Sequence, residues 1–491
     1  MADAEGGSGV SAKIITSETI NPAYKRIKYG LRGPLDQRSQ VIEEELAQGQ
    51  AKPFTEVVKH IGDPQGLQGQ KPITFMRQVL CLLTYPDLLQ DERFPSDVKK
   101  RVREILSEKN GGTISSYTSS QGLKIVRQQI ADFISTRDGY PEDLSNIYLT
   151  NGGGEAIRIV LKALMTADQE GPGRAGVMIP IPEYPLYSGR LLELNGYQIP
   201  YFLNEDDNWQ LEMGELQRAL NSSRPHCVPR ALVLINPGNP TGQVLTYENI
   251  REVIKFCHRE RLVLFADEVY QDNIYADGCA FHSCRKVLHD LGEEYRDFQL
   301  VSLHCSAKSH FGECALRGGY YQLTGFDEDV KSFFHNRMTL YSCPNIYGQV
   351  AMGIVCQPPK PGDDSYALYD KERTAIQKSM KEKAGMTTRF LNSLAGIQCN
   401  TVQGAMYAFP RVLLPDKAIQ AAKDQGLTPD SLYASELLEA TGQFVAPGSV
   451  MGQKEGTYHF RITIIPPLEK TVHQYEQFKR FHEDFMKKYE G

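Results

Sequence analysis

The clearest structural signal in this 491-residue chain is the run Leu262-Val263-Leu264-Phe265-Ala266-Asp267-Glu268-Val269-Tyr270. Its apolar first half is typical of a strand that is buried on both faces of a sheet. Two acids and a tyrosine follow the apolar residues directly. A carboxylate at the end of a buried strand must be paired or hydrogen-bonded to stay charged. We therefore expect Asp267 either to cap a helix or to hold a cationic ligand.

Similar apolar runs recur on both sides of this stretch, and each is followed by a helical pattern. They cover Ile147–Thr150, Gly176–Pro182, Ala231–Ile235 and Leu300–Leu303. Apolar residues at helical spacing also predict a helix over Asn249–Arg259. Alternating strands and helices predict a mostly parallel α/β sheet that is covered on both faces. In such sheets, ligands bind at the carboxyl ends of the strands.

The pattern changes after the turn-rich stretch Pro358–Asp364. A polar helical pattern follows to about Leu391, and a terminal amphipathic helix is predicted over Leu468–Tyr489. Between them, strands are predicted at Gly404–Pro410, Phe444–Gly448 and His459–Ile465. We expect an N-terminal arm with part of a small domain at 1–110, a large domain at 111–355, and the rest of a small α+β domain at 356–491.

Composition limits the possible partners. The chain has 54 Lys and Arg against 60 Asp and Glu, a net charge of -6, which disfavours nucleic acid and anionic membrane surfaces as partners. No apolar run approaches the roughly 18 residues of a membrane span. The first residues carry two acids before Lys13, unlike a secretory or mitochondrial leader. None of the ten cysteines forms a CxxC pair. We expect a soluble cytoplasmic protein with reduced thiols and no metal site.

Glycine and asparagine motifs follow two of the predicted strands. Asn151-Gly152-Gly153-Gly154-Glu155 leads into a helix, where free N–H groups and the helix dipole suit a phosphate. The alternative is a tight turn that binds nothing, and the motif matches neither a Walker loop nor a dinucleotide fingerprint. The stretch Asn236–Gly242 contains two Asn-Pro pairs, which enforce a rigid extended turn. That turn would aim the Asn239 amide at a ligand.

A lysine follows the last predicted strand of the series. Most lysines lie at the surface, but Lys308 comes soon after Leu300–Leu303 and precedes Arg317-Gly318-Gly319-Tyr320. We expect burial near cations to lower the pKa of Lys308, which would free its amine for a Schiff base. His304 and Cys305 are adjacent on a strand and point to opposite faces, which argues against a thiol–imidazole pair. Asp267 and Glu268 cannot converge for the same reason.

These parts together are what pyridoxal 5′-phosphate requires: an imine partner, an anion site, a carboxylate for the ring nitrogen and donors to the ring hydroxyl. The sequence resembles the fold-type I, class I aminotransferases and, among them, the alanine aminotransferase family. The motifs are Tyr29–Pro34, Ile179–Tyr187, Asn236–Gly242, Ala266–Tyr270, Phe311–Cys314 with Arg317–Tyr320, Gln403–Tyr407 and Gly456–Arg461. GECxxRGGY and GTYHFR are the most specific of them. The resemblance implies a mostly parallel seven-stranded sheet in a large domain and a smaller α+β domain.

The resemblance also implies roles at the cofactor. Lys308 would form the Schiff base and move the substrate proton, and Asp267 would pair with the ring nitrogen. The remaining cofactor contacts would come from Tyr270 and Asn239 at the ring hydroxyl, Tyr184 on the ring face, and Gly153, Gly154, Cys305 and Arg317 around the phosphate. Tyr117 would reach the phosphate from the other subunit of a homodimer.

On the substrate side, the resemblance implies that Arg461 binds the α-carboxylate, with Asn239 and Gly33 as further contacts. Arg32 is a candidate for the distal carboxylate of glutamate, and a surface salt bridge is the alternative. The implied reaction moves the amino group between L-alanine and 2-oxoglutarate and gives pyruvate and L-glutamate.

Several positions depart from the family pattern around the cofactor. Cys305 replaces a serine, Gly153-Gly154 replaces Ala-Ser, Ser309 replaces a glycine and Met451 replaces a phenylalanine. Two hydroxyl donors to the phosphate are lost, which at about 1 kcal/mol each predicts cofactor binding weaker by about tenfold or more. One alternative is therefore a diverged enzyme of the same fold that acts on another amino acid or catalyses elimination or decarboxylation. Another is a non-catalytic binding or scaffold protein, against which the intact Lys308 and Asp267 argue.

Overall fold

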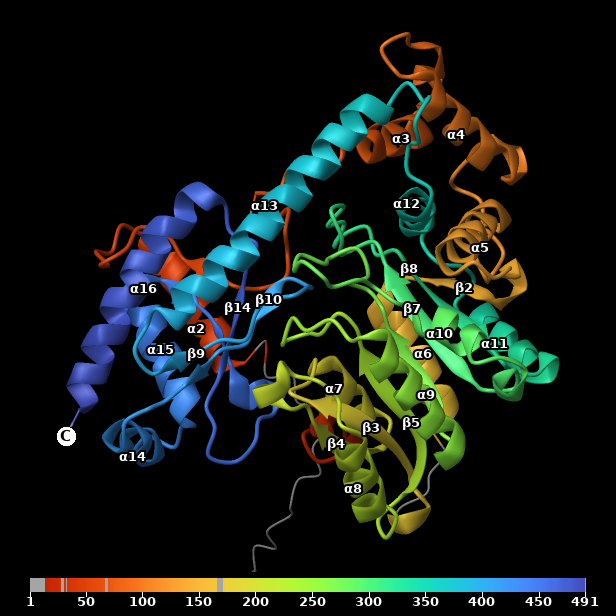
Figure 1. The fold of residues 1–491 in the computed structure, drawn as a ribbon. Coiled ribbons are helices and arrows are strands. Elements are labelled where there is room, and N and C mark those ends of the chain that lie inside the picture. Colours follow the sequence, from red (N-terminus) through yellow and green to blue (C-terminus); the bar gives the residue numbers. More distant parts are fainter. Residues whose placement is uncertain (1–13, 28–30, 32, 67–68, 166–170, 491) are drawn as a thin grey trace, which may run out of the picture.

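We describe the fold from a computed structural model, which describes residues 14–27, 31, 33–66, 69–165 and 171–490. The chain forms a larger α/β part around one central sheet and a smaller part built mainly from its C-terminal third (Figure 1). In these described ranges, no helix combines the length and the apolar composition needed to cross a membrane.

The central sheet has seven strands in the order β2-β8-β7-β6-β5-β3-β4. They are β2 (Ile147–Thr150), β3 (Ala175–Ile181), β4 (Tyr197–Phe202), β5 (Val228–Ile235), β6 (Val263–Asp267), β7 (Leu300–Cys305) and β8 (Gly319–Thr324). Strands β4, β3, β5, β6 and β7 are mutually parallel, whereas β8 is antiparallel to both β7 and β2. The predicted mostly parallel seven-stranded sheet is therefore confirmed.

Five of these strands coincide with the apolar runs of the sequence, and two do not. Strand β4 lies at the edge of the sheet, and its sequence contains Pro200 and exposed positions, so it lacks a continuous apolar run. Strand β8 begins at Gly319, inside a glycine-rich motif that we interpreted only as part of a phosphate site. The predicted helix over Asn249–Arg259 corresponds to α9 (Tyr247–Glu260).

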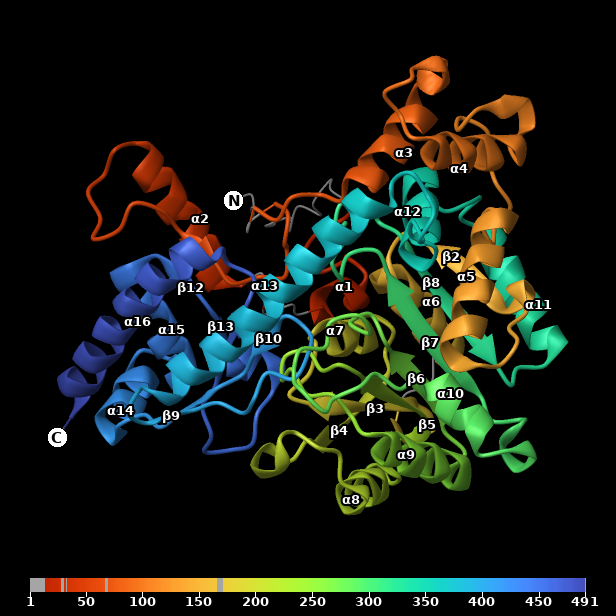
Figure 2. The ribbon, with the colours of Figure 1, turned by 45° about the horizontal axis from the view of Figure 1, so that its top comes forward.

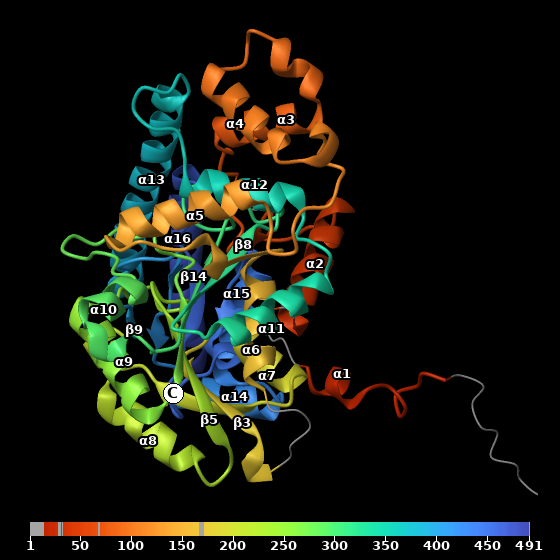
Figure 3. The same cartoon turned by 90° about the vertical axis from the view of Figure 1, so that its right-hand side faces the viewer.

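Helices cover both faces of the sheet (Figure 3). One face packs against α6 (Gly153–Leu164), α7 (Leu186–Glu193) and α11 (Glu328–Thr339). The other packs against α8 (Met213–Ser223), α9 and α10 (Cys284–Asp290). At the β2 end, a further core joins α3 (Thr74–Thr84), α4 (Ser96–Ser107), α5 (Lys124–Asp138) and α12 (Ile346–Cys356). The sheet is thus closed to solvent on both faces, and its strand ends are left to form a site.

The smaller part follows a 27-residue helix, α13 (Tyr366–Asn392). Its other elements are β9 (Ile397–Gln398), β10 (Tyr407–Ala408), β11 (Arg411–Val412), α14 (Asp416–Asp424), α15 (Pro429–Thr441), β12 (Gln443–Phe444), β13 (Ala446–Pro447), β14 (Phe460–Thr463) and α16 (Leu468–Tyr489). The terminal helix begins and ends at the predicted residues. The smaller part contains a three-stranded sheet in the order β10-β14-β13, and Figure 2 shows β10 on the side that faces the larger part.

The N-terminal residues divide between the two parts. Beyond the short α1 (Pro22–Arg26), α2 (Pro34–Ala47) packs against the smaller part, and β1 (Val58–Lys59) pairs with β12. In contrast, α3 and α4 share a core with α5 and α12 of the larger part. The proposed division at residues 110 and 355 stays a prediction.

Candidate active site

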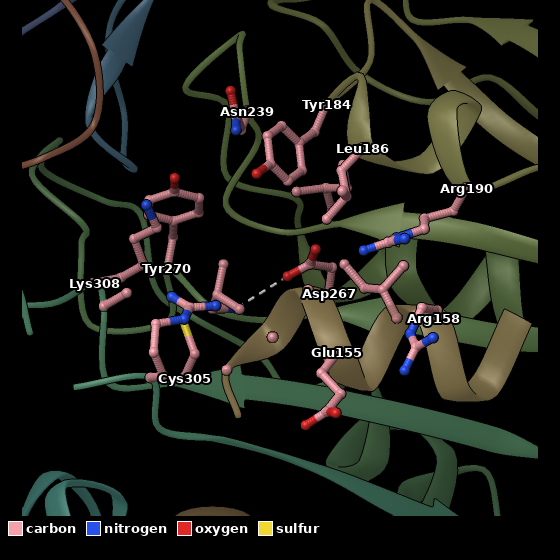
Figure 4. A pocket seen from close by; sticks show the side chains of 18 of the residues that line it. Glu155, Arg158, Tyr184, Leu186, Arg190, Asn239, Asp267, Tyr270, Cys305 and Lys308 are labelled. Carbon is pink, nitrogen blue, oxygen red and sulfur yellow. Dashed lines mark hydrogen bonds between the residues drawn. The ribbon is translucent and has the colours of Figure 1, made fainter. Parts of the chain in front are cut away.

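A cavity of about 570 Å³ lies at the carboxyl ends of β5, β6 and β7. Its walls come from the β2–α6 turn, the start of α7, the ends of these three strands, the turn after β7, and β10 of the smaller part. Figure 4 shows Lys308 and Tyr270 at one end of the cavity and Arg158 and Arg190 at the other, with Asp267 between them. The strand topology therefore collects side chains that lie far apart in sequence.

Asp267 is the last residue of β6 and is 4% exposed. Its carboxylate accepts a hydrogen bond from Tyr187 Oη at 2.8 Å and one from the Val269 N–H at 3.4 Å. Burial raises the pKa of Asp267, and the bond from Tyr187 opposes that rise. Its neighbour Glu268 turns the other way and accepts from the Cys284 N–H at 2.7 Å. The two acids do not converge, as the strand geometry predicts.

Lys308 lies in the turn after β7, with its Nζ 5.3 Å from the ring centre of Tyr270. Burial by itself would lower the pKa of Lys308, but Tyr407 and the thiol of Cys314 outweigh it and raise the pKa. The expectation of a lowered pKa is therefore wrong for this structure. The sequence suggested that nearby cations would lower the pKa of Lys308. In the folded chain, the acidic groups of Tyr407 and Cys314 have the larger effect.

Tyr407 links the lysine to the smaller part. Its Oη lies 3.1 Å from the Oη of Tyr270, and the guanidinium of Arg461 stacks 4.3 Å from its ring centre. Burial would raise the pKa of Tyr407, but the charges of Lys308 and Arg461 lower it. Arg461 is 3% exposed and donates from Nη1 to Asn239 Oδ1 at 3.2 Å. Its Nε is buried and has no hydrogen-bond partner among the described residues.

The glycine turn opens α6 beneath Arg317. Gly152 has φ +91°, and a Cβ there would lie 2.4 Å from Arg317 Nη2, so this position needs glycine on both counts. Arg317 donates to the carbonyls of Cys314 and Asn151 at 3.0 and 3.2 Å. In contrast, a Cβ on Gly153 or Gly154 would meet its neighbours only at 3.8 and 3.5 Å. The structure has room for the side chains that the family carries at these two positions.

Cys305 ends β7 and lines the cavity. Burial raises the pKa of its thiol to about 11, so the thiol is protonated at neutral pH. His304 packs on the opposite face of the strand, where its ring stacks on Phe133 with centroids 6.4 Å apart. This arrangement agrees with the argument against a thiol–imidazole pair.

Some predicted residues do not reach the cavity of their own chain. Tyr117 is 81% exposed and Gly33 precedes α2, and neither lines the cavity. Arg32 lies outside the described residues. The structure therefore does not bring Tyr117 or Gly33 to the cavity within one chain.

Sequence reasoning assigned no role to three residues that the structure places here. Tyr187 and Tyr407 both stand inside motifs that we recognised, Ile179–Tyr187 and Gln403–Tyr407. Nothing local shows that Tyr407 lines the cavity or that Tyr187 is buried against Asp267. Gly62 approaches from the N-terminal segment, where a Cβ would lie 2.2 Å from Tyr407 Oη. Its approach is visible only in the folded chain.

The model of the family "Aminotransferase class I and II" matches residues 81–473. This chain belongs to that family. As a class I and II aminotransferase it depends on pyridoxal 5′-phosphate. The chain is 49% identical over 480 residues to "Alanine aminotransferase 2-like" of Danio rerio, covering 97% of this chain and 87% of the relative. It is 48% identical to "Alanine aminotransferase 1" of Homo sapiens, covering 98% and 97%.

Solved aminotransferase structures share the fold at much lower identity. An alanine aminotransferase from Pyrococcus furiosus superposes with a TM-score of 0.72 at 20% identity, covering 94% of this chain and 99% of that one. An aminotransferase from Escherichia coli gives a TM-score of 0.73 at 21% identity, covering 95% and 98%. These structural matches support the fold-type I architecture.

The residues around the cavity fit the cofactor of the aminotransferase family. The free N–H groups at the start of α6 and the guanidinium of Arg317 flank space that a phosphate can fill, since Cβ atoms at Gly153 and Gly154 would meet no obstacle. Buried Asp267 offers a carboxylate to a cationic ring nitrogen. The buried Nε of Arg461 has no hydrogen-bond partner among the described residues, which leaves it available to an acceptor on a ligand.

Proposed function

We propose that this protein transfers the amino group between L-alanine and 2-oxoglutarate, giving pyruvate and L-glutamate. The observation that carries the proposal is that Lys308 and Asp267 line one cavity, while Arg461 contacts Asn239 and Tyr407 in its wall. Relatives with alanine aminotransferase in their names, 46 to 49% identical over nearly the whole chain, favour this substrate pair.

The cofactor would be held along the whole cavity. Asp267 pairs with the ring nitrogen, and Tyr187 keeps its carboxylate ionised and in place. The other contacts are Tyr184 on the ring face, Asn239 and Tyr270 at the ring hydroxyl, and Gly153, Gly154, Cys305 and Arg317 around the phosphate. When bound, the cofactor supplies an electron sink for charge that develops at the substrate Cα.

Lys308 and Arg461 act on the substrate itself. Arg461 binds the α-carboxylate with its unpartnered Nε and the adjacent Nη2, while Nη1 stays on Asn239. This orients the substrate Cα toward Lys308. Lys308 would hold the cofactor through its Nζ, and the same amine would take the proton from the substrate Cα. The positive charges of Lys308 and Arg461 lower the pKa of Tyr407, which would help Tyr407 to donate a proton beside the lysine.

The active form is proposed to be a homodimer in the cytoplasm. Tyr117 projects from its own chain and would reach the phosphate of the other subunit. Gly33 is proposed as a substrate contact at the edge of the same site. A relative from Dictyostelium discoideum is named mitochondrial, so fractionation of the native protein is the test of the compartment.

The first experiment follows the visible absorption of the lysine-bound cofactor in the purified protein after reconstitution. L-Alanine should abolish this band and 2-oxoglutarate should restore it, with pyruvate and L-glutamate formed in equal amounts. Lys308→Ala should lose the band and at least about 1000-fold of the activity. A band that ignores alanine would contradict the substrate. Ammonia or carbon dioxide as a product would favour elimination or decarboxylation.

A further inference from the structure

A second cavity of about 640 Å³ lies between α13, the segment Gly69–Pro72 and the start of α16. None of the residues that line it also lines the catalytic cavity. Its size is in the range of small-molecule sites in proteins. The proposed function uses none of these residues.

The floor of this cavity carries a buried ammonium group. Lys383 on α13 is 7% exposed, and its Nζ donates to the Ile465 carbonyl at 2.8 Å. Among the described residues, this ammonium makes no ion pair within 4 Å. Burial lowers the pKa of Lys383 to about 8, and the more distant Glu469 opposes this only in part. An ammonium has three N–H groups, so an anion in the cavity would gain two charge-assisted donors.

The other charged groups of the cavity favour a single negative charge. Lys71 and Lys371 stand at its rim with Lys383 below them, against Glu372 and Glu469. The carboxylate of Glu372 already accepts hydrogen bonds from the N–H and the hydroxyl of Thr74. The lining therefore carries three cations and two acids. A monoanion would balance this lining.

Apart from Gln70 and Ser379, the remaining side chains of the wall are apolar and would suit a hydrocarbon chain. They consist of Leu368, Ala375, Ile376, Met380, Ile465, Pro467 and Leu468. Leu368 is half exposed at the mouth, whereas Met380 is buried beside Lys383. A ligand with an acidic head at the floor and an apolar tail toward the mouth would cover both kinds of surface.

We propose that this cavity binds an amphipathic monocarboxylate, with its carboxylate on Lys383 and its hydrocarbon tail between α13 and the start of α16. A medium-chain fatty acid is the ligand class of this size and charge. The site is independent of the catalytic cavity and of the substrate assigned above.

The test is calorimetric titration of the holoenzyme with sodium decanoate, compared with decanol. We expect saturable binding at one site per chain with a Kd below about 1 mM. Decanol, which lacks the charge, should bind at least about tenfold more weakly. Absence of saturable decanoate binding, or equal binding of decanol, would overturn the proposal.

Three variants locate the binding. Lys383→Met removes the ammonium with little change in volume and should weaken decanoate binding at least about tenfold. Leu368→Glu adds a negative charge at the exposed mouth of the cavity and should also weaken decanoate binding. Lys381→Met is the matched control on the same helix, since Lys381 faces outward and pairs with Asp277 at 2.6 Å; it should bind decanoate like the parent.

Thermal unfolding of each variant checks that it is folded. If Lys383→Met fails to fold, Leu368→Glu and the decanol comparison still decide the matter, because neither alters a buried group. Binding that is insensitive to both Lys383→Met and Leu368→Glu would place the decanoate elsewhere, for example on Arg461, and would refute the site.

Discussion

The hydroxyl of Tyr187 favours the charged form of Asp267, the residue proposed to pair with the cofactor ring. Asp267 is buried, and burial favours its neutral form, while the Tyr187 hydroxyl at 2.8 Å favours the carboxylate. The electron-sink role needs the carboxylate. We therefore propose Tyr187 as a positioning residue that would act on the cofactor through Asp267.

Replacement of Tyr187 by phenylalanine tests this pairing. Loss of the donated hydrogen bond should raise the pKa of Asp267 further. Because Asp267 must be ionised, activity is lost as pH falls through its pKa, so the acid limb of kcat/KM should move to higher pH. A pH profile identical to that of the parent enzyme, with the cofactor bound, would show that Tyr187 does not set this pKa.

At the proposed phosphate site, two substitutions are predicted to tighten cofactor binding. Gly154→Ser and Cys305→Ser should each restore a hydroxyl donor, and the structure has room at Gly154, where a Cβ meets only Leu186 at 3.5 Å. The double variant should retain cofactor on dialysis with a Kd lower by about tenfold. Gly152→Ala is the contrasting control, because its Cβ would lie 2.4 Å from Arg317 Nη2, and it should weaken cofactor binding. Unchanged affinity in the double variant would mean that backbone donors already satisfy the phosphate.

At the scale of elements, the close approach of β8 to the start of α6 shapes the phosphate site. Gly319 opens β8 and pairs with Thr150 of β2, directly before the glycine turn. A Cβ on Gly319 would lie 2.7 Å from the carbonyl carbon of Gly152 and 2.8 Å from the nitrogen of Gly153. Only a strand that begins with glycine can support the turn from this side.

Gly319→Ala should therefore displace the turn and weaken cofactor binding, by about tenfold or more, without unfolding the sheet. The reconstitution titration of the absorption band measures this. Gly214→Ala on α8 is the control, since a Cβ there meets nothing within 4 Å and alanine favours a helix. Equal cofactor affinity in the two variants would contradict this account of β8.

For the whole molecule, the site is assembled from both parts of the chain. The larger part supplies Asp267 and Lys308, whereas Tyr407 and Arg461 come from the smaller part. A change in the relative position of the parts would move the substrate carboxylate relative to Lys308. The proposed homodimer adds one more element, the exposed Tyr117 of the other subunit.

Hybrid dimers test that arrangement. Tyr117→Phe alone should weaken cofactor binding about fivefold or more, and Lys308→Ala alone should be inactive. If Tyr117 serves the other subunit, a hybrid of the two variants contains one intact site and should regain cofactor affinity like that of the parent enzyme at half of the sites. If Tyr117 serves its own chain, the hybrid will show only the weakened affinity of Tyr117→Phe. A protein that sediments as a monomer would remove the basis for the arrangement.

The sequence by itself determined five of the seven strands of the sheet, the long helices and the placement of Asp267, Asn239 and Lys308 after strands. These features depend on periodicity and burial within short windows, which a sequence shows directly. Strands β4 and β8 were not predicted, because β4 lies at the sheet edge and β8 begins in a glycine-rich motif, so neither shows that local pattern. Only the tertiary structure decided the hydrogen bond from Tyr187 to Asp267, the stacking of Arg461 on Tyr407 and the raised pKa of Lys308. Each of these joins elements far apart in the chain, and electrostatic and packing energies depend on distance in space, which no local pattern contains.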